Sequence, residues 1–525
     1  MRHVEARAGA YADSVTLMQV TAQAQAIPGV QAALVAMATD LNLGLLADLG
    51  LQPPDRAGPN DMLVAVQADD GESLATALAA VDNALRSRPA DQAGAAEQPP
   101  RTTFTAARRA GTGLALISVP GQFAFIEAVD ALDAGCDVMI FSDNVPVEEE
   151  VWLKDRAAER GLLVMGPDCG TAIVAGIGLG FSHSVPAGPI GLVAASGTGA
   201  QQVICLLDAA GCGVSAVLGV GGRDLSAAVG GRSARAALAA LDADPATELI
   251  VLLSKPPAER VAAELREYAA TLATPVQFAL IGPGQPDLTA AAEAALRASE
   301  RRVAAWPVWP AVGDAAPPVG RAGTGALRGL FAGGTLCDEA MVIAAERLGP
   351  VYSNIPLRPQ WRLDPRGPAG PRGPRGSSES VASDRSGPWH IMIDFGDDEL
   401  TAGRPHPMID QGQRLDRLAA EAADPATAVI MLDVVLGHGA HPDPAAEIAP
   451  AIVAAHAARA ASAASAAGFG TELAVVVSLI GASSDPQGLT AQATALAAAG
   501  AHVFASNAQA ARFACGLVGG IGGTI

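Results

Sequence analysis

The chain has 525 residues and a formal net charge of −20 at pH 7. This length exceeds what one hydrophobic core supports, so about three or four domains are expected. The negative charge argues against nucleic acid and anionic membrane surfaces as partners, and the lack of a long apolar run or a basic leader predicts a cytoplasmic protein.

Residues 1–90 predict a small α/β domain in which three strands alternate with three helices, comparable in size to a ferredoxin-like domain. No Gly-rich turn follows its first strand, so a regulatory or interfacial role is expected rather than a nucleotide site. The strands are expected at His3–Ala8, Val30–Met37 and Asp61–Val66, and the helices near Asp13, Asp40 and Glu72.

A linker rich in Pro, Ala and Gln, at 87–103, leads to a second unit at 104–186. Its alternation of short apolar runs and amphipathic segments is typical of half of a Rossmann-like, doubly wound domain. Strands are expected at Leu114–Val119, Val138–Phe141 and Leu162–Met165, and helices at Gln122–Ala134 and Val147–Arg160.

A Gly-rich turn dominates the third unit, at 187–312. Ile190–Ala194 is predicted to be a buried strand, and Ser196–Gly199 a turn whose hydroxyl caps the next helix. Such a turn points backbone N–H groups and the helix dipole at one spot, which suits phosphate or a carboxylate. A second Gly turn, Gly219–Asp224, should lie at the same edge of a parallel sheet. The alternative is two tight connections that bind nothing.

The same layout recurs at 322–525, which indicates that a flavodoxin-like unit is duplicated. Asp-Pro-Ala-Thr precedes a strand at 244–247 and again at 424–427. Gly329–Thr335 and Asp394–Asp398 are the counterparts of the two Gly turns. Two such units side by side would bring two helix N-termini towards one anion. A Pro- and Gly-rich stretch at 364–388 is predicted to be a disordered insertion.

The six cysteines are scattered, and none belongs to a Cys-x-x-Cys pair. His438 and His441 have a spacing that would not direct both onto one metal from a strand or loop. Neither a disulfide framework nor a metal site is therefore predicted.

Several separated motifs resemble the FdrA proteins, a branch of the succinyl-CoA synthetase superfamily, and the likeness covers nearly the whole chain. Residues 165–171, 188–202 and 219–225 are also similar to the synthetase α subunit, and the second repeat to the carboxyl-terminal domain of the β subunit. The resemblance implies a CoA-binding-type domain followed by two ligase domains. The FdrA-like motifs are Phe141–Val145, Gly222–Leu225, Ser254–Pro257, Gly403–Asp410 and Leu432–Gly437.

The chain also departs from the synthetase. No histidine lies between His183 and His390, so the position of the phosphorylated histidine is empty, and the similar Gly437–Ala440 lies in the other repeat. No Gly-x-x-x-x-Gly-Lys loop replaces the missing ATP-grasp domain, and the Gly-rich turn of a CoA site is not visible. CoA and phosphate are therefore both open as bound cofactors.

FdrA-like proteins are linked to oxamate carbamoyltransferase, a multi-subunit enzyme of purine catabolism that converts oxalurate and phosphate into oxamate and carbamoyl phosphate. The resemblance implies this activity, together with partner subunits and a small anionic substrate. A site with backbone donors suits the chemistry, because phosphorolysis needs bound phosphate and a stabilised oxyanion. The alternatives are an acyl-CoA ligase and a non-catalytic binding or regulatory subunit.

The candidate residues come from the strand ends and Gly turns, and their roles follow from residue type. Structural ion pairs are the alternative for the arginines, a solvated loop for the lysine, and a stiffened loop for the histidine. Phosphate is expected on Ser196, Gly197 and Thr198, and on Gly333, Gly334 and Thr335. Arg223 and Arg404 could clamp an anion, oriented by Asp224 or Asp398, with Lys255 as a point charge and His406 as general acid or base. The residues expected to line the pocket are Asp168, Cys169, Gly221, Gly222, Asp224 and Asp398. Cys169 is either a nucleophile or a small buried residue of the pocket wall.

Overall fold

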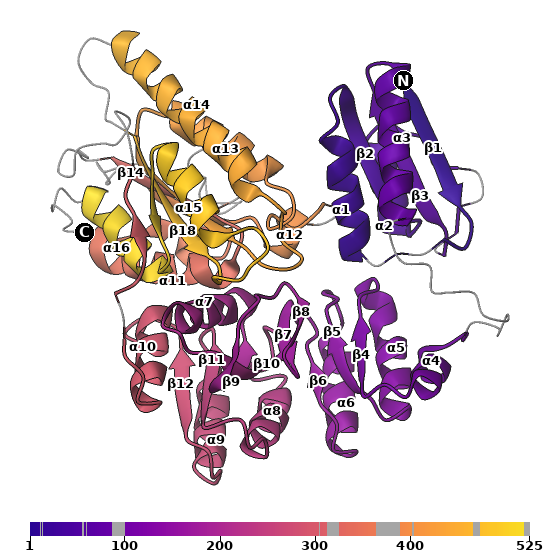
Figure 1. The fold of residues 1–525 in the computed structure, drawn as a ribbon, viewed down its shortest axis with the longest axis vertical. Coiled ribbons are helices and arrows are strands. Elements are labelled where there is room, and N and C mark those ends of the chain that lie inside the picture. The colour runs from indigo at the N-terminus through magenta and orange to yellow at the C-terminus, as the bar shows by residue number, and fades with distance from the viewer. Residues whose placement is uncertain are drawn as a thin grey trace.

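The computed structural model shows four α/β units joined in chain order (Figure 1). It describes all residues except 11, 13, 55–56, 59, 87–99, 304, 312–324, 364–388, 402–403, 466–472 and 519–525. The insertion predicted at 364–388 and most of the linker predicted at 87–103 thus lie outside the described residues.

The N-terminal unit is an antiparallel sheet in the order β1-β3-β2. Helices α1 and α3 pack on one face, against Val35 and Val64, while α2 places Leu46 on Ala65 of the other face. The predicted order of elements is confirmed, but the unit has helices on both faces, unlike a two-layer ferredoxin-like domain. The elements are β1 (Arg2–Arg7), α1 (Ser14–Gln25), β2 (Val30–Met37), α2 (Asp40–Asp48), β3 (Met62–Ala68) and α3 (Gly71–Arg86).

The second unit has the predicted parallel strands, in the order β4-β5-β6. Its core is small, with Val138 and Ile140 of the central strand packed against Ala124 and Leu153 of the helices. The elements are α4 (Thr103–Ala110), β4 (Leu114–Ile117), α5 (Gly121–Asp133), β5 (Asp137–Ile140), α6 (Val147–Ala158) and β6 (Val164–Met165).

The third unit is a six-stranded sheet in the order β12-β11-β9-β10-β7-β8. Strands β9 to β12 are parallel and almost wholly apolar, as expected for strands covered on both faces. The hairpin β7–β8 joins the edge of this sheet through Ile173 and Val217, although the sequence places it in the second unit. The elements are β7 (Thr171–Val174), β8 (Ile177–Gly180), β9 (Ala187–Ala195), α7 (Gly197–Ala209), β10 (Val214–Gly219), α8 (Arg232–Asp242), β11 (Leu249–Ser254), α9 (Glu259–Ala269), β12 (Val276–Leu280) and α10 (Leu288–Ala298).

The fourth unit is a seven-stranded sheet in the order β13-β19-β18-β17-β14-β16-β15. Among the strands that the structure describes in this sheet, only β13 runs antiparallel to its neighbour. The elements are β13 (Val308–Trp309), β14 (Ala326–Phe331), α11 (Gly334–Leu348), β15 (Val351–Tyr352), the short 3-10 helix η1 (Pro359–Trp361), β16 (His390–Asp394), α12 (Asp398–Thr401), α13 (Gly412–Ala423), β17 (Thr427–Val435), α14 (Pro444–Ser465), β18 (Ala474–Ile480), α15 (Leu489–Ala498), β19 (Ala501–Phe504) and α16 (Asn507–Val518).

The strand orders confirm the duplication. The run β10-β9-β11-β12 of the third unit matches β16-β14-β17-β18 of the fourth, and both follow flavodoxin-like order. Each Asp-Pro-Ala-Thr motif leads into the equivalent strand, β11 or β17. The strand and helix starts predicted for the first two units are close to those observed.

A buried hydrogen bond between a histidine and an aspartate joins the third and fourth units. His183 Nδ1 lies 2.6 Å from Asp485 Oδ2, and neither side chain is exposed. Asp485 also accepts the backbone N–H groups of Ser184 and Ala482. These bonds hold the pKa of the Asp485 carboxyl below its usual value, although burial alone would raise it.

We expect Asp485→Asn to destabilise the protein by about 3 kcal/mol at pH 7, since it leaves a buried histidine and two donors poorly matched. The lowered folded-state pKa means that this stabilisation is present above about pH 4 and is lost as the pH falls further. Urea unfolding of both proteins at pH 7 and pH 3.5 measures it. A difference between the two proteins that is unchanged at pH 3.5 would contradict the assignment.

Candidate functional site

The two Gly turns of the repeats meet where α7 and α11 begin. Ser196 caps α7 by accepting the Gly199 N–H at 3.0 Å, and its Oγ lies 2.6 Å from Thr335 Oγ1. The helix starts pack closely, because a Cβ on Gly333 would lie 2.7 Å from the methyl carbon of Thr198. The duplication thus places Thr198 and Thr335 at one site, on facing helix N-termini.

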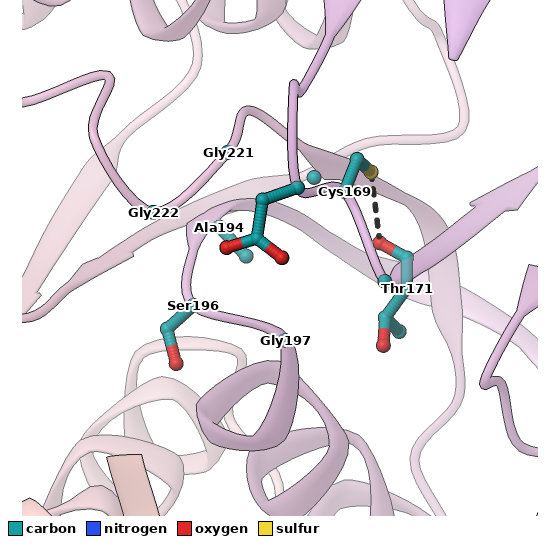
Figure 2. Close-up of a pocket in the computed structure, with 10 residues that line it drawn as sticks. Cys169, Thr171, Ala194, Ser196, Gly197, Gly221 and Gly222 are labelled. Carbon is teal, nitrogen blue, oxygen red and sulfur yellow. Dashed lines mark hydrogen bonds between the residues drawn. The ribbon is translucent and has the colours of Figure 1, made fainter. Parts of the chain in front are cut away.

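A recessed pocket opens beside the start of α7 (Figure 2). The empty space between its lining residues measures about 190 Å³, a figure that includes open solvent. Ser196 and Gly197 approach it from one side, and Cys169 and Thr171 from another (Figure 2). Residues of α11 do not line this pocket. The lining residues are Asp168, Cys169, Gly170, Thr171, Ala194, Ser196, Gly197, Gly219, Gly221 and Gly222.

Asp168 is the carboxylate of this pocket. It is exposed to solvent within the recess, yet the surrounding protein still limits its hydration. Desolvation raises the pKa of Asp168 to about 7, and the charges of Asp398 and Asp143 add to the effect. Asp168 can therefore hold or release a proton near neutral pH.

Cys169 lines the pocket but is a poor nucleophile. Its side chain is buried, and Sγ faces the carbonyl of Thr171 at 3.7 Å. Burial raises the pKa of the thiol to about 12, so the thiolate is scarce at neutral pH. The geometry favours the pocket-lining interpretation over nucleophilic catalysis.

Lys255 follows β11 and lies among carboxylates. Its Nζ is 3.3 Å from Asp338 Oδ2, on α11 of the other repeat. Burial lowers the pKa of Lys255, but Asp338 and Asp394 outweigh this and raise the pKa above its usual value. Lys255 is therefore an ammonium ion at neutral pH, and it is better placed to attract an anion than to act as a base.

Two aspartates of neighbouring strands lie beside the start of α11. Asp433, at the end of β17, accepts the N–H groups of Ala332 and Gly333 at 2.7 and 2.8 Å. Its charge is balanced by the buried Arg414, 3.1 Å away. Asp394 lies beside Gly334. At the second predicted phosphate site, the Gly333 N–H is therefore already used by Asp433. The predicted phosphate site at the start of α7 is the more open of the two.

Arg223 and Asp224 do not form the pair that the sequence suggested. Arg223 contacts Glu150 Oε2 at 2.9 Å and donates to the carbonyl of Val145. Asp224 is buried, binds Lys154 at 2.8 Å and caps α8 through the N–H groups of Ser233 and Ala234. Asp224 is therefore structural, whereas Arg223 is half exposed and near enough to Asp168 to lower its pKa.

Arg404 and Asp398 are not among the residues that line the pocket, although the sequence predicts Asp398 to be one of them. The Arg404 side chain is exposed, and its backbone N–H donates to the carbonyl of Thr401. Asp398 begins α12, and its pKa is raised by partial burial and by the charges of Asp143 and Asp397. The structure shows no contact between the two in the described residues.

His406 lies in the loop before α13, outside the residues that line the pocket. Its Nδ1 accepts the Met408 N–H at 3.2 Å, so a neutral ring carries its proton on Nε2. Burial, reinforced by Arg414, lowers the pKa of His406 to about 4. At neutral pH the ring is neutral and can donate a hydrogen bond from Nε2, and the role of His406 as general acid or base stays a prediction.

Sequence analysis did not identify the carboxylates beside the cations of the site. These are Asp338 and Asp394 near Lys255, and Glu150 near Arg223. Asp394 does begin the predicted counterpart of the second Gly turn, Asp394–Asp398, which is the one signal that could have identified it. Lys154 could have been singled out by its rarity, because Lys154 and Lys255 are the only lysines of the chain.

Two protein-family models match separate parts of the chain. Residues 1–101 match the model described as AllF, heavy metal-associated domain, and residues 330–517 match the CoA-ligase model. Residues 1–101 contain no cysteine, so a soft-metal thiolate site is not available there. Within the described ranges no cluster of three His, Cys, Asp or Glu residues could hold a metal, and none of the described helices has the length and hydrophobicity of a membrane span.

Known proteins resemble the chain over different lengths. The uncharacterized protein YahF of Escherichia coli (strain K12) is 38% identical over 515 residues, 95% of each chain. The succinate–CoA ligase α subunit of Aquifex aeolicus (strain VF5) is 30% identical over 160 residues, 29% of this chain and 51% of that subunit. A dinucleotide-forming acetyl-coenzyme A synthetase structure from Ca. Korarchaeum cryptofilum aligns with 78% of this chain and 82% of that chain, at 15% identity and a TM-score of 0.28. The likeness to YahF over nearly the full length, together with the two family matches, shows that the chain belongs to the FdrA/AllF-like family and contains succinyl-CoA synthetase-like units.

Proposed function

We propose that this chain binds phosphate at the start of α7 and takes part in transferring a carbamoyl or acyl group of a small anionic substrate. The observation that carries the proposal is the meeting of the duplicated Gly turns, with Ser196 and Thr335 hydroxyls 2.6 Å apart. Within the described residues no protein acceptor is seen for the N–H groups of Gly197 and Thr198. Such free first-turn donors, with the helix dipole, favour an anion.

The specific reaction we propose is phosphorolysis of oxalurate, which the family resemblance suggests. A phosphate oxygen attacks the carbamoyl carbon, the bond from that carbon to the oxamate nitrogen breaks, and the nitrogen takes up a proton. The products are carbamoyl phosphate and oxamate. Lys255 and Arg223 would attract the two anions, and Asp168, with its pKa near 7, could carry the proton. Partner subunits would complete the enzyme.

An acyl-CoA ligase is the second candidate, and the match of residues 330–517 to the CoA-ligase model favours it. The turn after β4 weakens it, because Ser118–Gly121 contains a proline and one glycine where a phosphate-binding turn would be rich in glycine. The missing histidine between His183 and His390 weakens it further, since the ligases' phosphorylated residue has no equivalent here.

Calorimetric titration of the full chain with phosphate, oxamate and CoA separates these candidates. We expect phosphate and oxamate to bind, each in the micromolar to millimolar range, and CoA not to bind. Phosphorus NMR of the chain with oxalurate, phosphate and co-purified partner proteins should then show carbamoyl phosphate. Tight CoA binding without phosphate binding would support the ligase, and a chain that binds none of the three would be a structural or regulatory subunit.

A further inference from the structure

Asp394 lies at the end of β16, beside the first residue of α11. Only 6% of the residue is exposed. Buried Asn354 holds its backbone with two hydrogen bonds, of 2.9 and 3.0 Å. The carboxylate is therefore fixed at the carboxyl edge of the fourth unit's sheet, beside the start of α11.

The two oxygens of Asp394 face different neighbours. Oδ1 accepts the Gly396 N–H at 2.9 Å. Oδ2 lies 2.6 Å from the point that a Cβ on Gly334 would occupy, and Lys255 Nζ lies 3.3 Å from the same point. No hydrogen-bond donor to Oδ2 is found among the residues that the structure describes. Oδ2 thus borders the space beside Gly334 that Lys255 Nζ also borders, and it has no ion-pair partner among the described residues.

We propose that Asp394 is the proton-holding carboxylate of the anion site: it takes up a proton when an anion binds beside Lys255 and returns it when the anion leaves. This inference rests on the anion site of the proposed function. A bound anion adds negative charge near Asp394, Asp338 and Asp168, which share one ammonium ion, so protonation of a carboxylate relieves the repulsion.

Asp394 is better suited to this role than the other carboxylates at the start of α11. Asp338 already pairs with Lys255, and both oxygens of Asp433 accept backbone N–H groups while Arg414 balances its charge. Burial raises the pKa of Asp394 to about 7, and Lys255 only partly offsets this.

The basic and thiol groups near Asp394 keep one charge state between pH 7 and 9. A proton taken up in this range can therefore be attributed to a carboxylate. Lys255 stays protonated because its pKa is raised, and Arg414 stays charged even though burial lowers its pKa from 12.5. His406 stays neutral, with its pKa lowered to about 4, and burial keeps Cys337 a thiol by raising its pKa. Asp168 is the other carboxyl near the site with a pKa of about 7.

Sulfate is the probe, because it stays fully ionised over this range and brings no proton of its own. Calorimetry of the wild-type chain in buffers of different ionisation enthalpy should show net proton uptake, and the dissociation constant should rise up to about tenfold per pH unit above pH 7. Asp394→Asn should bind sulfate with a dissociation constant that changes less than about twofold per unit. The matched loop variant Asp397→Asn should keep the wild-type dependence.

The wild-type chain and the variants test the proposal independently. Sulfate binding by the wild type with no proton uptake overturns the role of Asp394 but leaves the anion site standing. Retention of the pH dependence in Asp394→Asn, or its loss in Asp168→Asn alone, assigns the proton to another group and also overturns it. No binding of sulfate or phosphate at all would remove the proposed function together with this inference.

Discussion

Replacing Lys154 with methionine is expected to destabilise the chain by about 3–5 kcal/mol, because it leaves buried Asp224 without a cation and Glu150 with Arg223 alone. Lys154 Nζ lies 2.7 Å from Glu150 Oε1 and 2.8 Å from Asp224 Oδ1, and all three side chains are at most 1% exposed. It also donates to the carbonyl of Val220 at 3.1 Å. Since Glu150 is on α6 and Asp224 precedes α8, the loss should loosen the contact between the second and third units. Urea unfolding, with the midpoint and slope compared with the wild type, measures the effect.

A surface ion pair between the same two helices provides the control. Arg232 Nε lies 2.7 Å from Asp155 Oδ1, with side chains 34% and 55% exposed. Solvent screens this pair, so Arg232→Met should cost less than about 1 kcal/mol. Equal losses in the two variants would show that burial of the Lys154 network is not what stabilises this contact.

The variant Ser196→Asp is expected to reduce turnover at least about 100-fold, within the range found when a group that stabilises charge in an active site is lost. Aspartate caps a helix as well as serine does, so α7 should still form. The added carboxylate would, however, occupy the proposed phosphate seat and lie close to Thr335. Product formation from oxalurate and phosphate, with a parallel phosphate titration, measures the loss.

Ser196→Asn separates charge from shape, because asparagine has the same size and capping ability as aspartate but no charge. Turnover within a few-fold of the wild type is expected for it. Activity retained by Ser196→Asp would show that phosphate binds elsewhere, and equal loss in both variants would point to crowding of the α7–α11 contact rather than to charge.

The sequence predicted more of the scaffold than of the chemistry. The strands β9, β11, β14 and β17 were predictable because each is a local apolar run that ends in a Gly turn or follows Asp-Pro-Ala-Thr. The facing of α7 and α11 was predictable as well, because two copies of one unit place equivalent turns at the same edge of each sheet. The predicted boundary at residue 186 did not anticipate that the hairpin β7–β8 joins the third unit's sheet, since its pairing with β10 depends on a non-local contact between Ile173 and Val217.

The roles of charged residues were harder to predict, for the same reason. Arg223 is adjacent in sequence to Asp224, yet it pairs with Glu150, more than seventy residues away. Cys169 and His406 have residue types that suit catalysis, but burial moves the pKa of one to about 12 and that of the other to about 4. Burial depends on what packs over a residue, which short-range sequence patterns do not contain.

The amino-acid sequence by itself determined the order of the strands and helices, the duplicated ligase unit and the hydroxyl-bearing turns, because periodicity, glycine and capping residues act over a few positions. Only the tertiary structure decided which carboxylate meets which cation. Lys255, Asp338 and Asp394 come from separate segments of two units, and their charge states depend on the shared burial and mutual fields that arise when the units pack together.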